Sequence, residues 1–269
     1  MNLLPQEPDE QLLPSKPEGN SNADKTESFD KVSAAPLIEP PSDTDADIEQ
    51  ASNPALTQDL ALALLKRRDL SDKAVEHISA NSSLMKQRKV RIAVAAHPHA
   101  PRRIALRLIR EFYTFDLMHF SLMPVVAADL KHTADEMLVA RLASVTLGER
   151  VSLARRGSSS VAGALLLDKE TRVWQTALEN PRLTENAIVK ALLRTNATPA
   201  FVEAVCRHAK WSPRHEIRIA LLRNEKTPMA RALEFARTLP PAQLRDILHA
   251  SRLPERIKNY LRENLDHRG

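Results

Sequence analysis

Cysteine and histidine are side chains that commonly bind zinc, and three of them lie close in sequence. Cys206, His208 and His215 flank a short turn, and thiolate and imidazole are common zinc ligands. Residues two positions apart on a helix do not share a face, so Cys206 and His208 should point in different directions. His97 and His99 have no cysteine or carboxylate pattern nearby. We therefore expect no metal site and no cofactor.

Serine could act as a nucleophile only in a suitable framework, and we find none. Residues 157–160, Gly-Ser-Ser-Ser, lack the glycine-framed serine of a nucleophile elbow, and the simplest interpretation is a joint between helices with Ser160 as N-cap. No glycine-rich phosphate loop is present. Asp168 and Glu170 fall at an expected helix start, where the helix dipole favours negative charge. The sequence thus predicts a non-enzymatic protein.

Arginine and lysine give the strongest surface signal. Basic residues three or four positions apart on a helix share a face, as Arg107 and Arg110 do. Basic residues from successive helices could form a stripe that binds an anionic partner. The alternative is a solvated, salt-bridged surface, because the same region holds 22 acidic residues. The candidate binding residues, including one tryptophan, are Arg103, Arg107, Arg110, Arg155, Arg156, Lys210, Trp211, Arg214 and Arg218.

A repeated segment indicates how these residues are positioned. Residues 187–194 read AIVKALLR, and residues 216–223, 29 positions later, read EIRIALLR. A Thr-Pro pair follows each copy, at 198–199 and at 227–228. A fixed period of about 20 to 50 residues is typical of a solenoid, in which each helical unit buries its apolar face against the next. We therefore expect the equivalent residues Leu192 and Leu221 to be buried.

Short helices joined by short turns are expected from Leu56 onward. Serine, threonine or proline at a helix start suits the unpaired N–H groups there, and Thr146 with Glu149 has the spacing of a capping box. The other expected starts lie at Thr57, Ser71, Pro101, Thr184, Thr198, Ser212, Thr227, Pro240 and Pro254. The resulting helices of roughly ten residues need packing partners for stability. Residues 111–144 break the rhythm and predict a longer helix pair or an insertion.

The Asn-Pro and Thr-Pro turns between these helices resemble those of HEAT-like repeats, particularly the leucine-rich repeat variant kind. Residues 179–184, ENPRLT, carry the resemblance, and residues 96–101, AHPHAP, are a looser copy. The resemblance covers about residues 56–265 and implies an all-α solenoid. Leucine-rich repeat variant proteins can carry a cysteine cluster that holds iron and sulfur. This chain has one cysteine, so no such cofactor is implied.

DNA glycosylases built from HEAT-like repeats use tryptophans and a carboxylate around a damaged base, and this chain has two tryptophans. The spacing of Trp174 and Trp211 alone does not support that chemistry. We expect Trp174 to pack in the core or between repeats. Trp211 lies in an expected turn and should be the more exposed of the two.

The N-terminal segment differs in composition from the rest of the chain. Residues 1–53 hold 12 acidic and 3 basic residues and seven of the 18 prolines, whereas the remainder holds 36 basic and 22 acidic residues. Such a segment cannot bury enough apolar surface to offset its ordering entropy. We predict a disordered acidic arm at 1–53 and a helical domain at 54–269. The arm is either a solvated, solubilising segment or folds back transiently over the basic part.

The location of the protein is predicted from three features. The first residues lack the basic and apolar regions of a signal peptide, and no apolar run approaches the ~20 residues that span a bilayer. The single cysteine, Cys206, suits a reducing compartment. We expect a soluble, cytoplasmic protein that does not bind a membrane.

These observations predict a non-catalytic scaffold or adaptor that binds a protein partner on the surface of a solenoid. One alternative is a HEAT-like protein that binds nucleic acid through a basic stripe. Another is an enzyme built on a repeat scaffold, of the DNA glycosylase kind. Phosphate contacts release counterions, so nucleic-acid binding should weaken steeply with salt, which separates the first two hypotheses.

Overall fold

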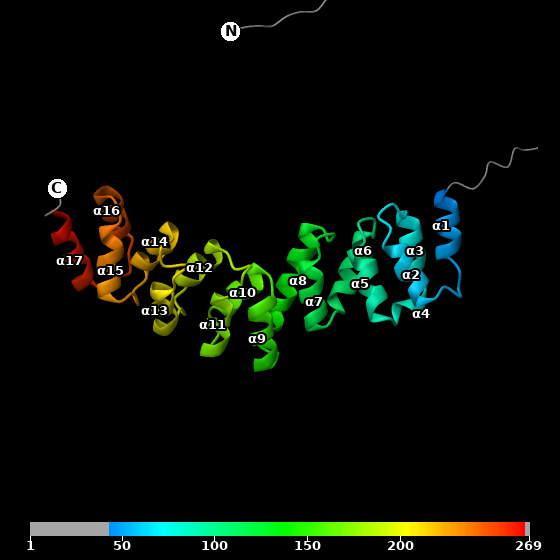
Figure 1. Cartoon of the computed structure of the whole chain (residues 1–269), viewed down its shortest axis with the longest axis horizontal. Coiled ribbons are helices and arrows are strands. Elements are labelled where there is room, and N and C mark those ends of the chain that lie inside the picture. The colour runs from blue at the N-terminus through cyan, green and yellow to red at the C-terminus, as the bar shows by residue number, and fades with distance from the viewer. Residues whose placement is uncertain (1–42, 267–269) are drawn as a thin grey trace, which may run out of the picture. The chain divides into compact units, whose positions relative to one another are not determined.

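The computed structural model describes residues 43–266, which contain 17 α-helices and no β-strand (Figure 1). The prediction of an all-α fold is confirmed for this range. The helices are α1 (Asp43–Ala51), α2 (Gln58–Leu65), α3 (Asp72–Ala80), α4 (Ser82–Met85), α5 (Arg88–Ala96), α6 (Arg102–Arg110), α7 (Thr114–Leu122), α8 (Ala128–Arg141), α9 (Leu147–Arg156), α10 (Ser159–Leu165), α11 (Thr171–Leu178), α12 (Glu185–Leu192), α13 (Pro199–Arg207), α14 (His215–Arg223), α15 (Met229–Arg237), α16 (Pro241–His249) and α17 (Glu255–Asp266). None of these helices is long and apolar enough to cross a membrane.

Several predicted N-caps are confirmed. The side chains of Thr57, Ser71 and Thr198 each accept a hydrogen bond from the backbone N–H three residues on. Thr146 and Glu149 form the predicted capping box. These contacts are local, and each pairs an N–H group that the first helical turn leaves without a partner.

Two predicted caps are wrong, and a third lies at the predicted residue but lacks a capping bond. Helix α10 is capped by Ser158 rather than Ser160, and α14 begins beyond Ser212, with Arg214 at its N-cap. Thr184 precedes α12 without a capping bond, and its hydroxyl pairs instead with the Ser159 hydroxyl at 2.8 Å.

Helix α1 changes the predicted domain boundary. Disorder is expected through residue 53, but residues 43–51 form α1, which packs on α3. Ala51 and Asp47 are buried, and Asp47 accepts hydrogen bonds from Arg67 at 2.7 and 2.9 Å. The boundary at 53 is therefore wrong, because a contact 20 residues away supplies burial that composition does not reveal. The predicted disorder of residues 1–42 lies outside the described residues.

Helices that are close in sequence pack against one another. One series joins α6, α8, α10, α12, α14 and α16, each to the next, and we call it the even row. Similar contacts link α5 with α7, α9 with α11, and α15 with α17. Within the described range, extensive contacts join only helices separated by at most two others. We call two consecutive helices with their turns a unit, and these contacts bring the turns of one unit near those of the next.

The stretch 111–144 contains the helix pair α7 and α8, and α8 is the longest described helix, at 14 residues. These two helices share the most extensive contact between any two helices in this part of the chain. A helix pair, one of the two outcomes predicted for the stretch, forms there, but only α8 is longer than its neighbours, because α7 has 9 residues.

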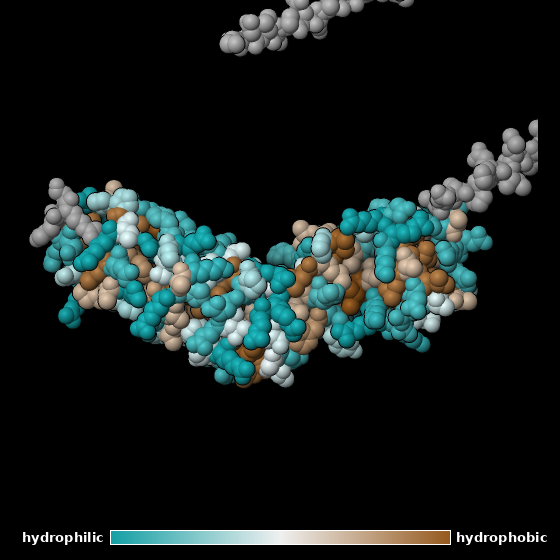
Figure 2. Space-filling view, viewed as in Figure 1, coloured by the Kyte–Doolittle hydropathy of each residue, from teal (hydrophilic) through white to brown (hydrophobic). Residues whose placement is uncertain are grey.

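The core consists of apolar residues from the facing sides of these helices. Leu192 and Leu221 are fully buried, as predicted. Trp174 is also buried and meets Phe201 edge to face, with ring centroids 6.0 Å apart. On α17, by contrast, Tyr260 is 44% exposed. Hydrophilic residues cover much of the face shown in Figure 2, with smaller hydrophobic areas between them.

Candidate functional site

Two of the predicted binding residues line an open groove between α3 and α6. The groove has a volume of about 580 Å³, and Arg103 and Arg107 lie along its α6 side. Ala80 and Ile104 supply part of its apolar lining. Arg103 is paired with Glu76 at 3.2 Å across the groove, so one of the two cations is already partly neutralised.

Arg110, Arg155 and Arg156 lie at helix ends rather than in this groove. All three are exposed, Arg110 at the end of α6 and the other two at the end of α9. The Arg110 backbone carbonyl accepts a hydrogen bond from Arg141, and the Arg156 carbonyl accepts one from Arg182. The predicted residues are thus divided between a groove and several turns.

The prediction for Trp211 is wrong. Its side chain is only 3% exposed, and its indole N–H donates to the Leu178 carbonyl at 3.1 Å. The Lys210 Nζ lies 4.1 Å from the centre of the indole ring, a cation–π arrangement. The turn is therefore closed against the preceding unit, a contact that local sequence does not reveal.

Arg218 is also less available than predicted. It is half-buried, its Nε donates to the Ser212 carbonyl at 3.0 Å, and its guanidinium lies 5.8 Å from the Phe235 ring centre. Arg214, by contrast, is exposed at the N-cap of α14. Of Arg214 and Arg218, only Arg214 has the exposed side chain that a binding residue needs.

Five polar side chains that the sequence analysis did not select connect successive units. Each accepts a hydrogen bond from the backbone N–H two residues on and also bonds to a group 23 to 32 residues earlier. We call them the inter-turn bridges. They are His97, Asn180, His208, Asn224 and Ser251.

His208 pairs with the Glu179 carboxylate, whereas the other four inter-turn bridges pair backbone carbonyls at or near helix ends. Asn180 Nδ2 donates to the carbonyls of Ala154 and Gly157, and Asn224 Nδ2 donates to that of Leu192. Carbonyls at the end of a helix lack an intrahelical donor. A sequence signal exists for two of them, since His97 and Asn180 each precede a proline just after a helix.

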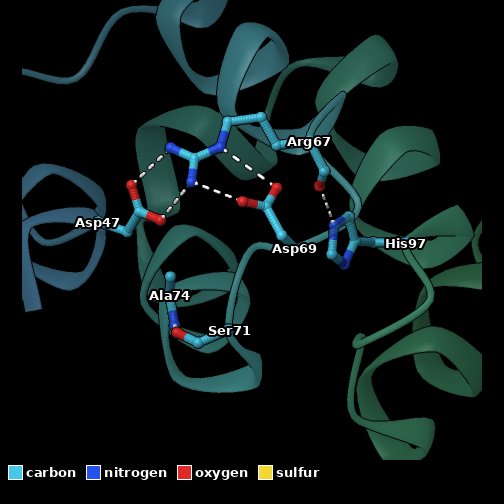
Figure 3. A network of polar contacts seen from close by, with 6 residues as sticks. All are labelled: Asp47, Arg67, Asp69, Ser71, Ala74 and His97. Carbon is cyan, nitrogen blue, oxygen red and sulfur yellow. Dashed lines mark hydrogen bonds and ion pairs between the residues drawn. The ribbon is translucent and has the colours of Figure 1, made fainter. Parts of the chain in front are cut away.

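The bridge at His97 joins a larger polar network, shown in Figure 3. The Arg67 guanidinium bonds to both Asp47 and Asp69, and the Arg67 carbonyl lies 2.8 Å from His97 Nε2. The Arg67 bond holds the pKa of Asp69 below its ordinary value. Burial lowers the pKa of His97. Its Nδ1 also accepts the His99 N–H at 3.2 Å, a role that requires the neutral ring.

Long basic side chains bond to carbonyls in the same way. Lys226 Nζ donates to the carbonyls of Thr195 and Ala197 at 3.0 and 2.7 Å. Arg141 donates to the carbonyls of Arg110, at the end of α6, and of Phe112 just beyond it. Arg252 donates to the Leu193 carbonyl. Part of the basic content of the chain therefore links units together rather than facing a partner.

A second open groove, between α10 and α12, contains residues that the sequence analysis did not select. Its volume is about 610 Å³. Gly163, Ala164, Ala187 and Ala191 supply small side chains, and the polar lining residues are Ser159, Ser160, Thr184, Asn186, Lys190, Arg194 and Asn196. No carboxylate lines it. The repeated segment already contained Lys190 and Arg194, but local sequence did not show that α10 lies opposite them.

Cys206, His208 and His215, the three residues considered for metal binding, each have a different environment or hydrogen-bond partner. Cys206 is buried, and burial raises the pKa of its thiol to about 12. His208 Nε2 lies 3.1 Å from Glu179, and His215 Nε2 lies 3.2 Å from Gln243. Across residues 43–266, no group of three or more His, Cys, Asp or Glu side chains is arranged to hold a metal ion.

The acidic pair near α11 has structural contacts. Asp168 accepts a hydrogen bond from the Glu170 N–H at 2.9 Å and pairs with Arg150 at 3.4 Å. The Arg150 and Asp168 side chains are both largely shielded from solvent. These contacts stabilise the start of α11 and its link to α9.

The chain was compared with known proteins at three levels. No protein-family model matches it, and neither the curated proteins nor the solved structures contain a match.

Proposed function

We propose that this protein is a non-catalytic adaptor, an α-solenoid of HEAT-like repeats that binds a protein partner on its helix surface. Repeats of about 29 residues and contacts between helices close in sequence support the solenoid. The observation that carries the function is the pair of open grooves between neighbouring helices, α3 with α6 and α10 with α12. Grooves between helices are common binding surfaces for peptide segments. We also propose a cytoplasmic location, which suits the free thiol of Cys206.

Affinity capture from native lysate tests the adaptor function. The full chain is immobilised, the lysate is divided, and one half is treated with nuclease before capture. Captured proteins are then identified by mass spectrometry. We expect one or more proteins to be retained after nuclease treatment and to be lost from a bait that carries Arg107→Glu with Lys190→Glu. Capture that is unaffected by both groove substitutions would contradict the proposal.

Nucleic-acid binding is the second candidate, because Arg155, Arg156 and Arg214 are exposed near helix ends. Phosphate contacts would make affinity fall steeply with ionic strength. Single-stranded and duplex oligonucleotides are titrated against the full chain at two salt concentrations. Binding that weakens with salt and is abolished by Arg155→Glu with Arg214→Glu would favour this candidate over the adaptor.

A further inference from the structure

The groove between α10 and α12 has a floor that a peptide backbone can approach closely. A Cβ added at Gly163 would lie 3.0 Å from the Ala187 Cβ, so the two helices nearly touch there. Ala164 and Ala187 are only half-buried beside this contact. Small side chains leave room for another chain to lie between the longer residues at the rim.

The charge of this groove favours an acidic ligand. Lys190 and Arg194 are exposed and are its only charged lining residues. Within residues 43–266, neither makes an ion pair, whereas Arg103 in the α3–α6 groove pairs with Glu76. Binding a carboxylate there would not require breaking an existing pair. Cations that face a ligand in this way contribute to selectivity for negative charge.

The spacing of the two cations matches an extended peptide. Lys190 lies in the last turn of α12 and Arg194 lies two residues beyond its end, where the Arg194 N–H still bonds to the Ala191 carbonyl. At a rise of about 1.5 to 2 Å per residue through this turn, their Cα atoms are separated by roughly 6 to 8 Å. Alternate side chains of an extended strand lie on one face about 6.6 Å apart. Carboxylates at positions i and i+2 of an extended segment could therefore reach both cations at once.

The remaining lining groups suit a peptide backbone. Asn186 and Asn196 each offer an amide that donates and accepts hydrogen bonds, and Ser160 adds a hydroxyl. An extended segment presents unpaired N–H and C=O groups to such side chains. Single-stranded nucleic acid binds on aromatic side chains that stack with bases, and no aromatic residue lines this groove.

Given an adaptor function, we propose that the α10–α12 groove binds an extended peptide segment with acidic residues at alternating positions. Lys190 and Arg194 bind the two carboxylates. The small floor residues admit the backbone, and the asparagine amides bond to it.

Two labelled peptides of identical composition test the spacing. Their sequences are Ala-Ser-Ala-Glu-Ser-Glu-Ala-Ser-Ala and Ala-Ser-Ala-Glu-Glu-Ser-Ala-Ser-Ala. Binding to the full chain is measured by fluorescence anisotropy at low ionic strength, where charge interactions are least screened. We expect the alternating peptide to bind more tightly. Equal affinity for the two peptides would overturn the proposed spacing.

Three variants test the site. Lys190→Glu with Arg194→Glu should weaken binding about tenfold or more, and Ala164→Trp should block the groove without a change in charge. The matched control, Arg155→Glu with Arg156→Glu, alters net charge equally on exposed residues outside the groove and should leave affinity nearly unchanged. Circular dichroism and thermal unfolding verify that each variant folds. Equal loss in the control, or full binding by folded Ala164→Trp, would overturn the proposal.

Competition and lysate capture separate this proposal from the adaptor function itself. An oligonucleotide of equal charge should compete poorly, and efficient displacement of the peptide by it would overturn the peptide assignment. If Ala164→Trp still captures the lysate partner and also binds the alternating peptide normally, the groove assignment fails while the adaptor function stands. If no captured protein depends on either groove, the adaptor proposal fails.

Discussion

The basic side chains of the turns and those of the α10–α12 groove differ in what they contact. Lys226 and Arg252 donate to backbone carbonyls that lie 29 to 59 residues earlier in the chain. Lys190 and Arg194 line an open groove that holds no carboxylate. A cation bonded to a carbonyl contributes to the fold, whereas an exposed cation without such a bond is available to a ligand. The number of arginines and lysines therefore overstates the binding surface.

The asparagines also differ between the turns, where they bond to the backbone, and the α10–α12 groove, where they are exposed. Asn224 is buried and bonds in two directions, to the Leu192 carbonyl and to the Lys226 N–H. Asn186 is exposed in the groove. Substitution at a turn should therefore lower stability, and substitution in the groove should alter binding instead.

The largest effect on stability should come from substitution of a fully buried leucine in the apolar core. Leu192 is fully buried, and its neighbour Leu193 is 40% exposed. We expect Leu192→Ala to cost about 2–5 kcal/mol of unfolding free energy and Leu193→Ala much less, measured by urea denaturation. Similar losses for both would mean that the exposed residue is covered in solution.

A smaller loss is expected at an inter-turn bridge. Asn224→Ala should cost about 1–3 kcal/mol, because a buried carbonyl and an N–H lose their partner. Asn186→Ala is the matched control and should change the free energy of unfolding by less than about 0.5 kcal/mol. If the two substitutions had equal effects, the distinction between turn and groove would not hold for uncharged side chains.

The bridge at His97 should make stability depend on pH. Because burial lowers the pKa of His97, the unfolded chain takes up a proton before the folded one does. Its contribution to stability is full above the ordinary histidine pKa of about 6.5 and is lost as pH falls through the lower folded pKa. We expect His97→Asn, which places there the residue found at 180 and 224, to remove this component, measured by denaturation between pH 7.5 and 5. An unchanged pH profile would assign the dependence to another group.

The smallest effects on stability are expected from substitution of two lysines, Lys226 in a turn and Lys190 in the groove. Lys226→Ala removes two bonds to carbonyls and should cost about 1 kcal/mol. Lys190→Ala should cost less than about 0.5 kcal/mol and should reduce affinity for the alternating acidic peptide. Thermal unfolding and anisotropy on the same samples measure both. A larger stability loss at Lys190 would show that this cation is structural as well.

Local features were the ones that sequence could predict. Thr57 and Thr198 cap their helices with a bond to an N–H three residues away, and the repeat placed Leu192 and Leu221 in the core. Trp211 was predicted wrongly because its partner, the Leu178 carbonyl, lies 33 residues earlier. The α10–α12 groove was missed for a similar reason, since it forms only where two non-adjacent helices meet.

The inter-turn bridges have a consequence for how such a chain can lengthen. Asn180, Asn224 and Ser251 donate to backbone carbonyls 23 to 32 residues earlier. A segment of about 29 residues therefore contains both the side chain that bonds backward and the carbonyls that receive the next side chain. Duplication of a whole unit would copy the donor and the acceptors together, so the new copy could form the same hydrogen bonds with its neighbours. Insertion of a few residues within a unit would instead displace the donor from its acceptors. Gain or loss of complete units is therefore the change in length that leaves these polar groups paired.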